Sequence, residues 1–106
     1  MILATTNEVP GRPIVEIIGI AKGTSVRARH AGRNILAFLR GHVGGEITEM
    51  TKVIAECREQ ALDRMVEEAR ELGANAVISV RFSTSFLMQG AAELLAYGTA
   101  VIVEDE

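Results

Sequence analysis

The strongest pattern along the chain is a helical repeat of apolar residues between Glu46 and Leu72. A helix turns by about 100° per residue, so one stripe of its surface would carry Ile47, Met50, Ile54, Cys57, Ala61, Met65 and Leu72, widened by Leu62, Val66 and Ala69. Most charged side chains of this stretch fall on the opposite half. Gly73 follows directly, at the place where a residue in the left-handed conformation commonly ends a helix. The pattern predicts one long amphipathic helix with a glycine stop.

Two β-prone runs precede this helix, at Ile2–Thr6 and Ile14–Ala21. The stretch between them contains Pro10, Gly11 and Pro13 and has the composition of a turn, so we predict a hairpin of two strands. The second run is apolar on both faces, which requires cover on both sides or a neighbouring chain on one of them. The polar stretch from residue 22 to residue 25 is predicted to end this strand.

Two further strands are predicted after the long helix. Residues 77–82 alternate, which places Ile78, Val80 and Phe82 on one face and Ser79, Arg81 and Ser83 on the other. The last run, Leu94–Val103, carries the small residues Ala96, Gly98 and Ala100 on one face. Small residues allow a helix to lie close against a sheet, and a glycine in a strand can mark a bulge.

The order of elements indicates the fold class. A short helix is predicted over about His30–Arg40, and glycines at 41, 44 and 45 would join it to the long helix. The chain of 106 residues is therefore expected to form a single α+β domain, residues 1–106. We predict an antiparallel sheet in the order β-β-α-α-β-β, with one short and one long helix packed on one side.

Composition and charge indicate which classes of partner, such as nucleic acids or membranes, the protein is expected to bind. The net charge of −3 is not that of a nucleic-acid-binding domain, although the interval between Glu16 and Glu46 contains basic residues and no acid. The first four residues lack a basic leader, and no apolar run is long enough to span a bilayer. We therefore expect a cytoplasmic location, with neither a membrane nor a nucleic acid as partner.

The candidate metal ligands are His30, His42 and Cys57. Their spacings are 12 and 15 residues, far from the two-to-five-residue spacing that local metal motifs use. The single cysteine lies on the apolar stripe, where a thiol generally packs as a small hydrophobe. The two histidines flank a helix of about ten residues, so they would lie roughly 15 Å apart. A divalent transition metal would therefore have to be shared between subunits of an oligomer.

A second candidate is an anion site formed by Arg27, Arg29 and Arg33, at a junction between subunits. The alternative is that these arginines pair with glutamates of this chain or of a neighbouring chain, since arginine is common at interfaces. Arg81 and Glu93 are expected to form a similar pair across facing strands. Motifs for nucleophilic catalysis or phosphate binding are missing from the sequence, so we do not expect an enzyme.

Several stretches resemble one protein family across essentially the whole chain: Thr5-Thr6, Val26-Arg27-Ala28-Arg29, Gly44-Gly45-Glu46, Gly73-Ala74-Asn75-Ala76-Val77, Val80-Arg81-Phe82 and Tyr97-Gly98-Thr99-Ala100-Val101. They are similar to the YbjQ-like family of putative heavy-metal-binding proteins. The resemblance implies a small cytoplasmic prokaryotic α+β protein, related in shape to dodecin-like subunits, that assembles into a homopentameric ring. It implies no established reaction, and it assigns no role to His30 or His42.

Three functions are compatible with these features. The first is a non-catalytic homo-oligomer that binds a heavy metal. The second is a module that binds an anionic small molecule, and the third is a purely structural assembly. All three require self-association, which the broad apolar surface of the long helix and of the second strand favours.

Overall fold

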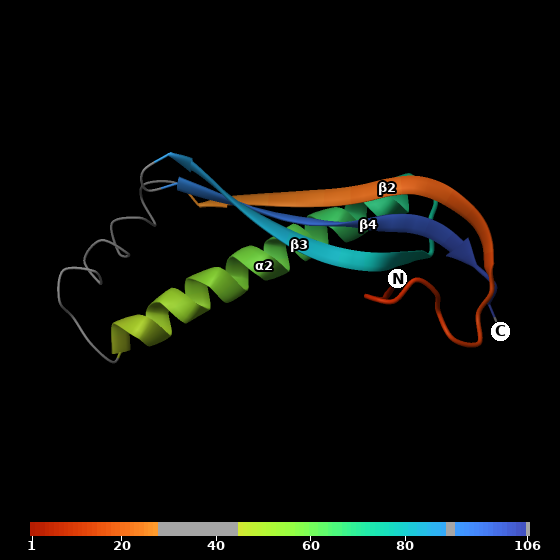
Figure 1. Cartoon of the computed structure of the whole chain (residues 1–106), viewed down its shortest axis with the longest axis horizontal. Helices are drawn as coiled ribbons and strands as arrows, with labels where there is room; N and C mark the ends of the chain where they lie inside the picture. The colour runs from red at the N-terminus through yellow and green to blue at the C-terminus, as the bar shows by residue number, and fades with distance from the viewer. Residues whose placement is uncertain (28–44, 89–90, 106) are drawn as a thin grey trace.

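The computed structural model describes residues 1–27, 45–88 and 91–105. Its elements are strand β1 (Ile2–Leu3), strand β2 (Ile14–Arg27), helix α2 (Gly45–Glu71), strand β3 (Ala76–Met88) and strand β4 (Ala91–Val103). Helix α2 crosses one face of the sheet that contains the three long strands (Figure 1). The α+β class is therefore confirmed, with the long helix on one side. The predicted short helix, His30–Arg40, lies outside the described residues.

The strand order in the sheet is β1-β3-β4-β2. Strand β4 pairs antiparallel with both of its neighbours, whereas β1 pairs parallel with β3. The predicted N-terminal hairpin is thus wrong, and the sheet is mixed. The main chain of the first run lies beside β3 instead, and its hydrogen bonds run from Ile2 N to Asn75 O (3.2 Å) and from Ala4 N to Val77 O (2.9 Å). The proline-containing stretch connects opposite edges of the sheet.

Helix α2 ends where the sequence predicted. Gly73 has a φ of 90°, which glycine adopts without steric cost. Its N–H donates to Arg70 O and the N–H of Ala74 donates to Ala69 O, both at 3.0 Å, which is the hydrogen-bond pattern of a Schellman motif. Asn75 then fixes the start of the next strand, because its side-chain amide donates to Val103 O (2.9 Å) and accepts from Val103 N (2.8 Å).

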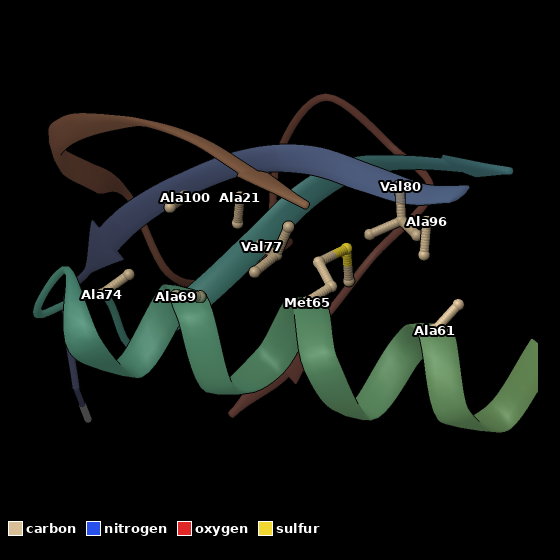
Figure 2. Packing of buried hydrophobic residues seen from close by; sticks show 9 residues of the cluster. All are labelled: Ala21, Ala61, Met65, Ala69, Ala74, Val77, Val80, Ala96 and Ala100. Atoms are coloured by element: carbon tan, nitrogen blue, oxygen red, sulfur yellow. The ribbon is translucent and has the colours of Figure 1, made fainter. Parts of the chain in front are cut away.

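Small residues fill the space between the helix and the sheet, as predicted for β4. Ala96 and Ala100 are fully buried, and Met65 of α2 lies at the centre of the cluster (Figure 2). The predicted apolar stripe is buried at Cys57, Ala61, Met65 and Ala69. At the two ends of the described part of the stripe, Ile54 and Leu72 are 50% and 44% exposed. Among the residues whose side chains are described, the stripe therefore covers the sheet along its middle and leaves Ile54 and Leu72 partly exposed.

Strand β2 does not stop at residue 22 but continues to Arg27. Gly23 lies within this strand because the helix approaches the strand backbone closely at that point. A Cβ added at Gly23 would overlap Ala61 O and Met65 N and would lie 2.8 Å from the carbonyl carbon of Arg64. Only glycine fits under the helix at this point. The glycine that looked like a strand breaker is a site of close packing.

A bulge in β3 changes which of its residues share a face. The pairing steps from Ile78 opposite Thr99 to Arg81 opposite Tyr97, so two residues of β3 stand opposite Gly98. Ser79 adopts a φ of 55°, which is unusual for a residue with a side chain. The predicted alternation of Ile78 and Val80 on one face is therefore wrong, because Val80 packs toward α2 and Ile78 packs on the opposite face.

The second face of the sheet is partly covered by the N-terminal segment. Ile2, Val9 and Ile14 pack against a small cluster formed by Ala76, Ile78, Val101 and Val103. The rest of this face, which we call the open face, has no cover within the described residues. In the described part of the chain, no helix has both the length and the apolar composition needed to cross a bilayer.

Candidate functional site

The single thiol lies in a small polar cluster between α2 and β2. Cys57 is 7% exposed, and its Sγ donates to Ser25 Oγ at 3.2 Å. Ser25 is fully buried, and its hydroxyl donates to Gln60 Oε1 at 2.6 Å. Each buried polar group here has a partner, which buried polar groups generally require. The thiol faces the interior of the subunit, with the hydroxyl and the backbone carbonyl of Ser25 as its polar neighbours.

Such neighbours do not make a closed heavy-metal site. Soft metals favour thiolate and imidazole donors, with three or four of them converging. Among the described residues, no group of three or more His, Cys, Asp and Glu side chains could hold a metal ion. His30 and His42 lie outside the described residues.

The predicted anion site falls largely outside the described residues as well. Arg29 and Arg33 belong to the stretch 28–44, and the side chain of Arg27 is also not described. The backbone of Arg27 ends β2, opposite Ala92 of β4. The expected pair of Arg81 and Glu93 is wrong, because Arg81 stands opposite Tyr97 whereas Glu93 stands opposite Ser85 and Val26.

A polar cluster that the sequence did not predict surrounds the bulge in β3. Ser79 N donates to Thr6 O (2.9 Å), and its hydroxyl donates to Asn7 Oδ1 (2.8 Å). Nearby, Arg81 Nη1 donates both to Thr5 O and to Val80 O, each at 2.8 Å. Except for the bond to Val80, these bonds join the N-terminal segment to a strand more than 70 residues away. The only sequence signal was the polar composition of residues 5–8 after a β-prone run.

Beside this cluster, three long polar or aromatic side chains form one row across the open face. Tyr97 of β4 pairs in register with Arg81 of β3 and with Lys22 of β2. Residues paired in this way point to the same face and have Cβ atoms about 5 Å apart. All three are exposed, with Tyr97 at 38%. We call these residues the cross-strand row.

Next to the row, the open face carries exposed isoleucines on β2. The register shift between Ile17 and Gly19 places Ile17 and Ile20 opposite Val101 and Thr99, on the same face. Ile17 is 68% exposed and Ile20 is 71% exposed. The sequence indicated that this strand is apolar on both faces. In the structure α2 covers one of those faces and leaves the two isoleucines bare.

Residues 1–104 match the profile of the YbjQ family, which is described as "Putative heavy-metal-binding". The chain belongs to the YbjQ family. It is 52% identical over 101 residues to a "UPF0145 protein" of Methanosarcina acetivorans, covering 95% of each chain. It is 56% identical over 104 residues to one of Dehalococcoides mccartyi, covering 98% of this chain and all of the relative. A third, from Pyrococcus abyssi, is 56% identical over 106 residues, covering 100% of this chain and 93% of the relative.

A solved structure shares the fold of this YbjQ family member. It is the crystal structure of a protein of unknown function from Pediococcus pentosaceus, assigned to the DUF74 family. The TM-score is 0.64 at 14% sequence identity, and the match covers 98% of both chains. This likeness concerns the fold alone. The family predicted from the sequence motifs is confirmed by the match of residues 1–104 and by the relatives at 52–56% identity. The family is described as heavy-metal-binding only in a putative sense, and no reaction is ascribed to it.

Proposed function

We propose that the protein is a non-catalytic, homo-oligomeric binding protein of the cytoplasm in which a heavy metal is held between subunits. The observation that carries the proposal is the pair of bare isoleucines, Ile17 and Ile20, on a strand at the edge of the sheet. Exposed apolar side chains beside an edge strand favour association with another chain. A second copy of this chain is the partner that the family resemblance favours, with five subunits in a ring.

The dimensions of the subunit support the same proposal. The radius of gyration of its Cα atoms is 16.9 Å, against roughly 13 Å for a compact domain of this length. Helix α2 and the long strands diverge toward the end where the helix begins (Figure 1). An elongated subunit exposes more surface than a compact one of the same length, and assembly can bury part of that surface.

The proposed metal site follows from the donors that one chain offers. Cys57 is buried and faces Ser25, so it is a poor candidate for a ligand shared with a neighbouring subunit. Besides the methionines, His30 and His42 are the remaining soft or borderline donors of the chain, and symmetry can bring copies of one histidine together around an axis. A shared site therefore needs histidine and not the thiol.

Native mass spectrometry with elemental analysis tests both parts. We expect an oligomer with fewer than one tightly bound zinc or copper ion per chain, lost in His42→Ala or His30→Ala and retained in Cys57→Ala. A monomer at micromolar concentration would contradict the assembly. Submicromolar binding of one ion per chain that Cys57→Ala abolishes would contradict the shared site.

A further inference from the structure

We propose that the cross-strand row, Arg81, Tyr97 and Lys22, binds a small organic molecule with an oxyanion group at each end. Neighbouring strands in a sheet lie about 4.8 Å apart, so the backbones that carry the two cationic residues are roughly 10 Å apart. A ligand with carboxylates or phosphates at that separation would lie across the strands with its middle over Tyr97. This inference does not depend on the metal site or on Arg27, Arg29 and Arg33.

Arg81 is held in place before any ligand arrives. Its Nη1 donates to two backbone carbonyls, Thr5 O and Val80 O, while Ser79 is anchored to Asn7 and Thr6. A guanidinium has five N–H donors in a rigid plane, so Nε and Nη2 remain for a ligand. An arginine fixed in this way loses little conformational entropy when it binds an oxyanion.

The positive charge of the row is not compensated within the described residues. The ion pair found there joins Arg12 and Asp105 at 3.6 Å, and neither Arg81 nor Lys22 takes part in one. The acid of β4 on the same face, Glu93, is four residues along the strand from Tyr97, which corresponds to about 14 Å. Two uncompensated cations on one face therefore favour a negatively charged ligand.

Tyr97 distinguishes this row from two scattered surface charges. Its exposed ring stands between the two cations in register, so it can contact the apolar middle of a ligand whose ends reach Arg81 and Lys22. Its hydroxyl can donate a further hydrogen bond to an oxyanion. Aromatic side chains commonly combine these two kinds of contact at binding surfaces.

Tyr97 is an intrinsic fluorophore at this site. The chain contains one tyrosine and no tryptophan, so ultraviolet-excited fluorescence near 300 nm reports on Tyr97 alone. We would titrate the protein with adipate, which has two carboxylates, with fructose 1,6-bisphosphate, which has two phosphates, and with inorganic phosphate. Comparison of the first two probes distinguishes a carboxylate from a phosphate ligand.

We expect at least one two-ended probe to change the fluorescence and to bind at least about tenfold more tightly than inorganic phosphate. Lys22→Gln should weaken that binding about tenfold or more, because the variant loses the hydrogen bond between a charged donor and the oxyanion. Arg81→Lys should keep part of the affinity, because the charge remains while the planar fork is lost. Arg70→Gln, on the exposed surface of α2, is the matched control and should bind as the wild type does.

Three results would overturn the proposal. The first is the absence of saturable binding by either two-ended probe at millimolar concentration. The second is an equal loss of binding in Lys22→Gln and Arg70→Gln. The third is a Lys22→Gln variant that binds the probe normally but has a lower oligomer mass by light scattering, because the cation then pairs with a neighbouring subunit. None of these results bears on whether the wild type is an oligomer, so the proposed function is tested separately.

Discussion

At the scale of single residues, two glycines set how closely the backbone layers approach each other. Gly23 lies directly under α2, and Gly98 faces the bulge of β3, where an added Cβ would lie 2.6 Å from Val77 Cγ1 and 2.9 Å from Ile78 O. A Cβ at residue 23 would meet backbone atoms of α2, which cannot rotate away as a side chain can. The absence of a side chain at residue 23 is therefore a requirement of the helix position.

Gly23→Ala should lower the free energy of unfolding by about 3 kcal/mol, because overpacking against a rigid backbone forces the helix and strand apart. Urea unfolding followed by circular dichroism measures the change. Thr24→Ala is the matched control, since residue 24 is exposed and its loss of strand propensity costs under about 1 kcal/mol. Equal stability of Gly23→Ala and the wild type would contradict this packing.

Single residues also differ in how far their role can be predicted from the local sequence. Gly73 could be predicted as a helix stop because the signal is local: a glycine follows a long apolar repeat. Gly23 and Ser79 were misinterpreted because their conformations depend on distant partners. Ser79 keeps its positive φ through hydrogen bonds to Thr6 and Asn7, which nothing in residues 77–82 indicates. A pattern of alternating residues cannot reveal a bulge that a remote segment stabilises.

At the scale of elements, local periodicity predicted the helix and the existence of the long strands but not their pairing. Strand β1 has only two residues, and its partner is chosen by main-chain hydrogen bonds to β3 and not by side-chain pattern. The hairpin was the nearest pairing in sequence, and the structure uses one more than 70 residues away. Of the predicted site residues, only Cys57 has a described side chain, and its stripe position was correctly predicted as buried.

The burial of Cys57 under β2 predicts low reactivity of the thiol. In the native protein, reaction with 5,5′-dithiobis(2-nitrobenzoate) should be at least about a hundredfold slower than in urea, because it requires local opening that costs a few kcal/mol. Absorbance at 412 nm measures the rate. The control is Ser83→Cys in a Cys57→Ala background, which places a thiol on an exposed strand position and should react quickly. Equal rates for the two native proteins would contradict the buried position of Cys57.

At the scale of the whole molecule, the open face combines two surfaces with different chemistry. The isoleucines of β2 favour burial against another apolar surface, whereas the cross-strand row one step along the sheet favours an anion. The two lie side by side, so a subunit that docks on the isoleucines would border the anion site without needing its charges. Assembly and ligand binding are thus expected to respond to different substitutions.

The combined substitution Ile17→Thr and Ile20→Thr should weaken assembly without unfolding the subunit. Both residues are mostly exposed within one chain, and threonine retains a high strand propensity, so circular dichroism should be unchanged. Burial of each isoleucine in an interface contributes about 1.5–3 kcal/mol, so loss of both should raise the dissociation constant by about a hundredfold or more. Light scattering across a dilution series measures this shift. Glu67→Gln, on the exposed surface of α2, should dissociate as the wild type does. If the double variant kept the wild-type mass at every dilution, the subunits would have to associate through some other surface.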